Sequence, residues 1–338
     1  MEQIRLGRTN LSVSRTGFGG IPIQRISNEQ SAKLLRRAYE AGIIYYDTAR
    51  SYSDSEEKIG YALHDVREKI VIATKTPASN RKQLMEHIDT SLRNLRTDYI
   101  DVYQMHNPAE VWEDVYEGLL ELKQQGKIRH IGITYHSREK AVAAVNSGMF
   151  ETLQFPLTFL SSEQDLALID LCREKDVGLL AMKGLAGGLI TDASCAFVFL
   201  RQYENVVPLW GIERSADLEE FIALENNPPA FDVALQQRMF AFQSELVGGF
   251  CRSCGYCMPC PQGIAIPTAA RIVPLMNRSR YQNFCSDEFA AQMARVDDCI
   301  NCGSCKSKCP YELDIPVLLR KQYEEYKILR EKYLGAEK

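Results

Sequence analysis

The chain has 338 residues, a formal net charge of −4 at pH 7, 45% hydrophobic residues and 25% charged residues. This composition is typical of a globular protein, and the mild acidity argues against nucleic acid and an anionic membrane surface as partners. No apolar run approaches the roughly 20 residues of a transmembrane helix, and the N-terminus lacks the apolar region of a signal peptide, so we expect a cytoplasmic location. The length suits one domain of about 250 residues and a smaller second domain.

Residues 1–228 predict a (β/α)8 barrel. A hairpin is expected first, at residues 5–14. Short apolar, mostly β-branched runs then predict buried strands at residues 16–20, 43–47, 70–74, 100–105, 130–134, 152–155, 178–182 and 206–210. Amphipathic patterns between them predict helices at residues 28–41, 81–95, 109–125, 137–147 and 162–175. This alternation favours a barrel over a doubly wound sheet. The glycine-rich residues 17–20 lead into Ile21-Pro22 rather than into the helix that a Rossmann turn requires.

Residues 229–338 predict a second, mainly α-helical domain. It follows a break at residues 226–229, which read Asn-Asn-Pro-Pro. Helical patterns cover residues 232–246, 267–276, 287–295 and 317–333. The last is a charged amphipathic helix that we expect to pack back on the barrel. The long spacing between the two cysteine runs of this region favours the helical type of two-cluster ferredoxin domain over a compact small ferredoxin.

The two cysteine runs predict two [4Fe–4S] clusters, because thiolates prefer soft metals and four of them surround one cluster. The second run has the spacing C-x-x-C-x-x-C-x-x-x-C-P of bacterial-type ligation, and the first is one residue shorter. In this pattern the fourth cysteine of each run binds the other cluster. One cluster is therefore expected on Cys251, Cys254, Cys257 and Cys309, and the other on Cys299, Cys302, Cys305 and Cys260.

Other interpretations of these cysteines stay open. Disulfides suit secreted chains, and nothing in the sequence indicates secretion. Four-cysteine zinc sites use paired C-x-x-C knuckles rather than three successive steps followed by C-P. Clusters with a purely structural role are an alternative to electron transfer. The remaining cysteines, Cys172, Cys195 and Cys285, read as small apolar residues.

Four polar residues lie at or just past the ends of consecutive barrel strands, where barrel enzymes carry their chemistry. Asp47 ends the second predicted strand and Tyr52 lies in the loop after it, while Lys75 follows the third strand and His106 the fourth. Each alone is most simply a solvated charge or an ordinary hydrogen-bonded side chain. Together, in consecutive strand–loop units, they predict a catalytic set.

These residues carry a family resemblance. The stretch D-T-A-R-S-Y-S-D-S-E-E-K-I-G at residues 47–60, the A-T-K that ends at Lys75 and the Q-M-H that ends at His106 resemble the aldo-keto reductases. The resemblance covers residues 3–225 and continues in I-R-H-I-G-I at 128–133, L-Q-F-P at 153–156 and A-M-K-G-L-A-G-G at 181–188. With the ferredoxin-like region, it implies the iron–sulfur-containing branch of that family, which is a barrel oxidoreductase with a nicotinamide cofactor.

The resemblance implies reduction of a carbonyl or related small molecule. Hydride adds to the carbonyl carbon and a proton to its oxygen, so an acid must lie beside that oxygen. Tyr52 is expected to supply the proton, and a nearby Lys75 to lower the pKa of Tyr52 from its ordinary value near 10 by favouring the phenolate. Asp47 would hold Lys75 charged and oriented, and His106 would donate to the carbonyl oxygen.

The implied cofactor contacts depart from the family pattern. Thr134-Tyr135 replaces the usual Ser-Asn, and Met182-Lys183 stand where an aromatic residue commonly stacks. The glycine-rich segment at 185–188 is expected to wrap a pyrophosphate, since glycine permits close approach. Asp217 stands where NADP-binding members often carry Arg, and its carboxylate would repel a 2′-phosphate, although Arg214 and Ser215 could compensate. The expected contacts are Gly20, Thr134, Tyr135, Gln154, Met182, Lys183, Gly184, Leu185, Gly187, Gly188, Gly211, Arg214 and Ser215.

The leading expectation is an NAD(P)H-linked reductase whose clusters carry electrons, with a redox partner protein. One alternative is an NAD(P)H-dependent reductase with structural clusters. Another is an enzyme that binds FMN or another flavin, because a nicotinamide delivers two electrons at once while each cluster accepts one, and flavins commonly divide such pairs. Tyr135 is the expected stacking residue for a flavin. A non-catalytic electron-transfer protein is the third alternative.

Overall fold

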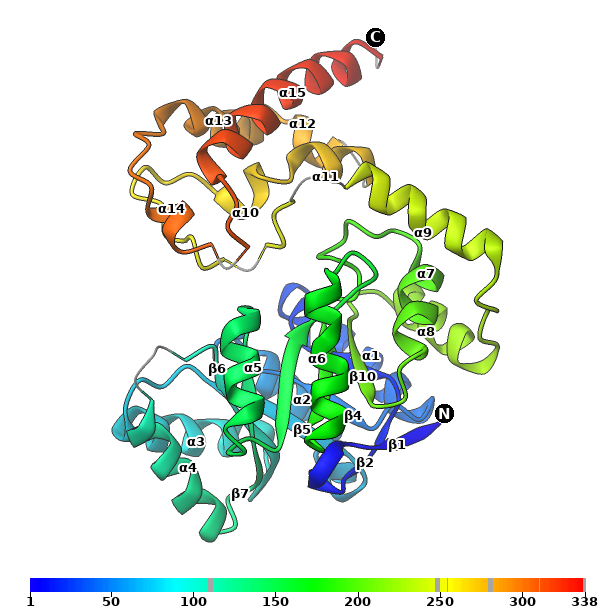
Figure 1. Ribbon diagram of the computed structural model, residues 1–338, viewed down its shortest axis with the longest axis vertical. Coiled ribbons are helices and arrows are strands. Elements are labelled where there is room, and N and C mark those ends of the chain that lie inside the picture. Colours follow the sequence, from blue (N-terminus) through cyan, green and yellow to red (C-terminus); the bar gives the residue numbers. More distant parts are fainter. Residues whose placement is uncertain (109–111, 247–249, 254, 279–281, 310, 337–338) are drawn as a thin grey trace. The chain divides into compact units, whose positions relative to one another are not determined.

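The computed structural model describes residues 1–108, 112–246, 250–253, 255–278, 282–309 and 311–336 (Figure 1). The chain divides into two compact units. One comprises Met1–Gly184 and Asp192–Gln236, and the other comprises Leu185–Thr191 and Gln237–Lys338. The units are interleaved along the sequence, because the short segment between the two stretches of the first unit belongs to the second unit. The division into domains at residues 1–228 and 229–338 stays a prediction.

A closed barrel of parallel strands forms the first unit, which confirms the predicted fold. Each strand pairs with the next along the chain, and the last pairs with the first to close the ring. Every residue of the strand at Val71–Thr76 is buried, as expected for a barrel that is packed inside and covered by helices outside. The strands are β3 (Gly17–Gly19), β4 (Tyr45–Asp47), β5 (Val71–Thr76), β6 (Ile100–His106), β7 (Ile128–Thr134), β8 (Thr152–Pro156), β9 (Gly178–Met182) and β10 (Val206–Gly211).

Helices alternate with these strands. Ser27, Asn80, Ser137 and Ser162 cap four of the predicted helices by accepting a hydrogen bond from a backbone N–H of the first turn. The helices are α1 (Asn28–Glu40), α2 (Ser55–Leu63), α3 (Arg81–Leu95), α4 (Glu113–Gln124), α5 (Arg138–Asn146), α6 (Glu163–Glu174), α7 (Ala193–Arg201) and α8 (Ser215–Asn226). The start of the helix predicted at 109–125 includes residues 109–111, which lie outside the described residues.

An N-terminal hairpin covers one end of the barrel. β1 (Gln3–Arg5) pairs antiparallel with β2 (Ser12–Ser14), and the 3-10 turn η1 (Gly7–Thr9) joins them. Leu6 and Val13 pack in a buried cluster with residues at the beginnings of barrel strands, such as Tyr45 and Val71. The end of the barrel that the hairpin leaves uncovered, called the open end below, is the one where the strands end.

The C-terminal region is mainly helical. Its helices are α9 (Val233–Glu245), α10 (Ile266–Ala269), α11 (Ile272–Arg278), α12 (Gln282–Cys285), α13 (Asp287–Ala294), α14 (Ser304–Ser307) and α15 (Ile315–Ala336). The helix predicted at 267–276 is divided into α10 and α11, with Arg271 between them. None of the helices in the described ranges combines the length and the apolar character needed to cross a bilayer.

The long helix α15 is packed within the C-terminal unit. Its residues Leu319, Tyr323 and Tyr326 belong to the buried core of that unit. The contacts of α15 include α10, α11, α12 and α14. Neighbours in its own unit therefore bury apolar side chains of this helix, and its expected packing on the barrel stays a prediction.

Candidate active site and iron–sulfur region

A buried ion pair joins β4 and β5 at the open end of the barrel. The Lys75 ammonium donates hydrogen bonds to both carboxylate oxygens of Asp47 and to the carbonyl oxygen of Thr48, each at 2.7 Å. Lys75 is fully buried and Asp47 is 4% exposed. Burial raises the pKa of Asp47 and lowers the pKa of Lys75, while the attraction between them opposes both shifts. The Gly20 N–H donates to the carbonyl oxygen of Asp47 at 2.7 Å, which fixes the backbone of this residue.

Buried amides extend the ion pair across the barrel interior. Gln154 donates to Asp47 Oδ2 at 3.4 Å, and Gln104 donates to Gln154 Oε1 at 3.0 Å. The Thr134 hydroxyl donates to Gln104 Oε1 at 3.3 Å. Both Gln154 and Thr134, which the sequence assigned to the cofactor, therefore belong to a network that ends on Asp47. Sequence analysis missed Gln104, although it lies in the Q-M-H motif and is the register partner of Lys75 on β6.

Tyr52 and His106 adjoin the ion pair, so the structure brings the four predicted catalytic residues together. The Lys75 Nζ atom lies 5.2 Å from the centroid of the Tyr52 ring. The rings of Tyr52 and His106 meet edge to face, with centroids 5.8 Å apart. Burial, followed by the charge of Lys75, lowers the pKa of His106 to about 3. The imidazole is therefore neutral at physiological pH and has one N–H to donate.

The pKa of Tyr52 is shifted in the direction opposite to the expected one. Burial of the phenol raises its pKa well above the ordinary value near 10, and the negative charge of Asp47 adds to the rise. Asp47 contacts the Lys75 ammonium directly, and its negative charge opposes the effect of that ammonium at the phenol. The expectation that Lys75 lowers this pKa was wrong for the protein by itself. Tyr52 consequently keeps its proton throughout the physiological pH range.

A second buried imidazole lies near this set. His136 is 7% exposed, and burial, followed by the charges of Lys183 and His106, lowers its pKa well below its ordinary value. His136 was not predicted as a site residue, although its position two residues after the end of β7 could have indicated it. The neighbouring Tyr135 is 4% exposed, so little of its ring is open for stacking on a cofactor.

The residues after β9 form a compact turn. Lys183, Gly187 and Gly188 all have positive φ, at 59°, 68° and 91°. A Cβ atom at Gly184 would lie 2.5 Å from the Trp210 ring, so packing against β10 requires glycine there. A Cβ atom at Gly188 would meet nothing within 4 Å. Of the glycines expected to bind pyrophosphate, Gly188 therefore faces open space. Met182 ends β9, and Leu185 begins the segment that belongs to the second unit.

Arg214 and Asp217 bind each other at the start of α8. Arg214 Nε donates to Asp217 Oδ1 at 3.1 Å, and the Arg214 backbone N–H donates to Asp217 Oδ2 at 3.1 Å. The hydrogen bond and the charge of Asp217 raise the pKa of Arg214. Gly211 ends β10 and Ser215 begins α8, so the expected adenosine-phosphate residues do lie in one loop. The positive charge that was expected to offset Asp217 is already paired with it.

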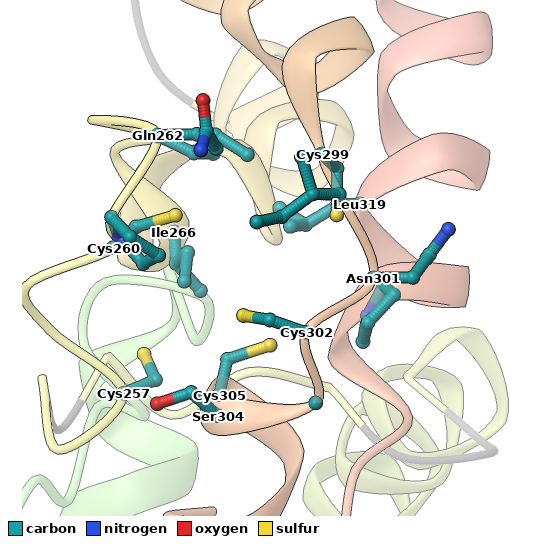
Figure 2. A pocket seen from close by; sticks show the side chains of 15 residues that line it. Cys257, Cys260, Gln262, Ile266, Cys299, Asn301, Cys302, Ser304, Cys305 and Leu319 are labelled. Carbon is teal, nitrogen blue, oxygen red and sulfur yellow. The ribbon is translucent and has the colours of Figure 1, made fainter.

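Cysteines of both runs line one pocket in the C-terminal unit (Figure 2). They are Cys257 and Cys260 from the first run, and Cys299, Cys302 and Cys305 from the second. Figure 2 shows the side chains of Cys302 and Cys305 pointing toward one another, with Cys257 and Cys260 on the other side of the pocket. Apolar side chains, including Ile266 and Leu319, complete the wall. Clustered thiols in an apolar setting fit the donor chemistry of an iron–sulfur cluster.

The first run also approaches the end of the second. The Arg252 guanidinium lies 4.1 Å from the centroid of the Tyr311 ring, and these residues follow Cys251 and Cys309 closely in sequence. Cys254 lies outside the described residues. Among the described residues, no three Cys, His, Asp or Glu side chains are grouped so that they could hold one metal ion.

Comparison with known proteins gives the family. The Aldo/keto reductase family model matches residues 15–196, which is more than half of the chain. This chain belongs to the aldo/keto reductase family. A 4Fe-4S dicluster domain model matches residues 250–314, which supports iron–sulfur clusters in the C-terminal region of this aldo/keto reductase. Both parts of the resemblance read from the sequence are confirmed.

Individual relatives match mainly the barrel. The chain is 30% identical over 212 residues to Aldo-keto reductase YhdN of Bacillus subtilis, covering 56% of this chain and 64% of that protein. It is 31% identical over 212 residues to the uncharacterized oxidoreductase YqkF of the same organism, covering 57% and 67%. The chain thus spans about two thirds of the length of these relatives. The solved aldo-keto reductase AKR11C1 from Bacillus halodurans superposes with a TM-score of 0.65 at 22% identity, covering 72% of this chain and 96% of that one, which supports the fold.

Substituting His106 with Gln should weaken the pH dependence of stability. The folded pKa of His106 is lowered to about 3, whereas an unfolded His titrates near 6.5. The unfolded state therefore binds more protons in this window, so stability is fully present above pH 6.5 and falls as the pH is lowered toward 3. We expect urea midpoints, measured anaerobically, to differ less between pH 7 and pH 5 in H106Q than in the parent. Because His64 is exposed, H64Q is the control and should keep the parent's difference. An undiminished difference in H106Q would contradict a buried neutral imidazole.

Proposed function

We propose that this aldo/keto reductase reduces a carbonyl or related small molecule, with Tyr52 as proton donor, and that its C-terminal unit carries two [4Fe–4S] clusters for electron transfer. The observation that carries the proposal is the convergence of Tyr52, His106 and the Lys75–Asp47 pair at the open end of the barrel. Each of these groups has a distinct part in the reaction.

The chemistry follows from these side chains. A bound NAD(P)H would supply the hydride. The proton moves from Tyr52 Oη to the carbonyl oxygen, which breaks the phenol O–H bond and leaves a phenolate close to the Lys75 ammonium. Because the pKa of Tyr52 is raised, the proton is present before the reaction at any physiological pH. The neutral His106 donates its N–H to the same oxygen, and Asp47 keeps Lys75 in place.

The arrangement of the cysteines supports the exchange of the fourth ligands between the two runs. Cys260 lines the same pocket as Cys299, Cys302 and Cys305, the set expected for one cluster, although Cys257, which is expected on the other cluster, lines it as well. The contact between Arg252 and Tyr311 brings the neighbourhood of Cys251 near that of Cys309, as the other cluster requires. Two one-electron clusters together hold as many electrons as one hydride delivers, which suits exchange with a redox partner protein.

A flavin-linked reaction is the second candidate. Both polar atoms of the Gln154 amide already have partners, in Asp47 and Gln104, so the residue expected to bind a nicotinamide amide is engaged within the barrel. Cofactor extraction from anaerobically purified protein separates the two candidates. Release of flavin would favour the second, while tight NAD(P)H binding with no released flavin would favour the first. Clusters that are not reduced by any donor on the time scale of turnover would favour a structural role.

Substituting Tyr52 with Phe should lower carbonyl reduction by roughly 100-fold or more, the range expected for loss of a positioned acid. The variant keeps the ring that packs against His106, so the cofactor affinity and the cluster spectrum should not change. Turnover of a panel of small aldehydes and ketones is the measurement. Tyr61, which is 55% exposed on α2, provides the matched control, and Y61F should retain activity. Undiminished turnover in Y52F would remove Tyr52 from the mechanism.

Alanine substitutions should reveal which cysteines share a cluster. We expect C260A and C302A to perturb one electron paramagnetic resonance signal of the reduced protein, and C251A and C309A to perturb the other. Iron content should also fall in each variant. Cys285, a buried cysteine outside both runs, is the control, and C285A should preserve both signals. If C260A and C251A instead perturb the same signal, each run holds its own cluster and the exchange of ligands is wrong.

Substituting Asp217 with Asn should shift cofactor preference toward NADPH by several-fold. The change removes the carboxylate that would repel a 2′-phosphate and frees the charge of Arg214, while the Asn oxygen can still accept from the backbone N–H at the start of α8. The measurement is the ratio of dissociation constants for NADPH and NADH. Glu219, on the same helix, pairs with Arg37, so E219Q tests the removal of a carboxylate elsewhere on α8 and should leave the ratio unchanged. An unchanged ratio in D217N would place the 2′-phosphate away from this loop.

A further inference from the structure

A segment that lies between two stretches of the barrel unit in the sequence belongs to the C-terminal unit. Residues Leu185–Thr191, which follow β9 in the sequence, belong to the same compact unit as the cysteine region. Arg271 Nη1 donates a hydrogen bond to the carbonyl oxygen of Gly187 at 3.0 Å, across 84 residues of sequence. This contact joins the turn that is expected to bind pyrophosphate to the core of the unit that carries the cysteines.

Arg271 lies where the predicted helix at 267–276 is interrupted. Its guanidinium also donates through Nε to the carbonyl oxygen of Pro267 at 3.1 Å, and the residue is 8% exposed. Burying a guanidinium is costly unless it has hydrogen-bond partners and a negative charge nearby. The two carbonyl oxygens supply hydrogen bonds but no charge. Cys251 belongs to the same buried cluster as Ala270 and Ile272, which flank Arg271 in the sequence. The carbonyl oxygen of Arg252, the residue after Cys251, lies 4.0 Å from the Cβ position of Gly187 that Arg271 Nη1 approaches.

Gly187 permits the close approach of this guanidinium. A Cβ atom at Gly187 would lie 2.8 Å from Arg271 Nη1, whereas a Cβ atom at Gly188 would meet nothing within 4 Å. Both glycines have positive φ, so both disfavour other residues for backbone reasons. Only at Gly187 would a side chain also displace Arg271. The two neighbouring glycines therefore separate the effect of the contact from the effect of backbone strain.

We propose that Arg271 is a positioning residue that holds the Leu185–Thr191 segment on the C-terminal unit and raises the reduction potential of the cluster bound through Cys251. The proposal rests on the proposed iron–sulfur function. Reduction adds an electron to the cluster, and a fixed positive charge in a poorly solvated setting stabilises the reduced state. One guanidinium interacts with both the cluster and the segment. A change in the charge of the cluster should therefore change how firmly Arg271 binds the segment, and displacement of the segment should in turn change the potential of the cluster.

The test uses the full-length, anaerobically purified protein with both clusters in place. A redox titration followed by electron paramagnetic resonance gives the potential of each cluster, and hydrogen–deuterium exchange reports on residues 185–191. R271Q should make one cluster harder to reduce by about tenfold in its reduced-to-oxidised ratio at a fixed potential, which is ~59 mV for one electron. The other cluster should be unchanged, and exchange at 185–191 should be faster. R271K keeps the charge and should largely preserve the potential while still speeding exchange.

The glycine pair gives a test that leaves Arg271 in the chain. G187A should shift the potential of the same cluster as R271Q and speed exchange at 185–191, and the matched G188A should leave the potential unchanged. If both clusters are present but R271Q and G187A leave both potentials as in the parent, the proposal is overturned. A parent protein that contains no iron–sulfur cluster would instead overturn the proposed function itself, and iron analysis distinguishes that outcome from the first. If G188A shifts the potential as much as G187A, backbone strain accounts for the effect and Arg271 does not set the potential.

Discussion

The buried pair of Lys75 and Asp47 is the interaction on which the polar interior of the barrel depends. Neither charge would be stable alone at this depth, because removing one partner of a buried pair leaves the other uncompensated. The pair also organises its neighbours: Gln154 and, through it, Gln104 bind the carboxylate side, while the Tyr52 ring faces the ammonium side. Burial is the largest cause of the pKa shifts of Tyr52 and His106, with the charge of Asp47 adding to the first and that of Lys75 to the second, and both groups stay neutral at physiological pH.

The C-terminal unit is held together on a different principle. Several of its helices, such as α10 and α14, are only four residues long. Helices of this length are not stable by themselves, so their positions must be fixed by their surroundings. Cys251, Cys257 and Cys305 are members of the buried core, alongside apolar residues of α11 and α15. Bonds from such cysteines to metal would contribute directly to folding, because metal-binding free energy is then also folding free energy.

Much of this architecture could be predicted from sequence, and the exceptions have physical causes. Strand runs are continuous and apolar because both faces of the barrel sheet are buried, so all eight were found close to their observed positions. The helix α7 was missed because its side chains are buried nearly all round, which leaves no amphipathic period to detect. The division of 267–276 near Arg271 was missed, although Pro274 within this range has no N–H to donate to the carbonyl oxygen four residues earlier.

The candidate site, too, could be predicted only in part from the sequence. The four polar residues could be assigned from their place after strands, because parallel strands bring their ends together. The direction of the pKa shift of Tyr52 could not be predicted, because it depends on how completely Asp47 compensates Lys75 and on how deeply the phenol is buried. The pairing of Arg214 with Asp217 could likewise not be predicted, because it depends on side-chain geometry, although the two residues are only three apart.

The interleaving of the two units has a consequence for how this chain can be divided and made. During synthesis, residues 192–236 complete the barrel before the residues that pack against Leu185–Thr191 have emerged. A barrel cut off after residue 236 would therefore carry a seven-residue segment without its natural neighbours, and a fragment that starts at residue 237 would lack part of its own surface. The iron–sulfur region is accordingly not a detachable module. Transplanting it onto another barrel would require grafting the turn after the ninth strand as well.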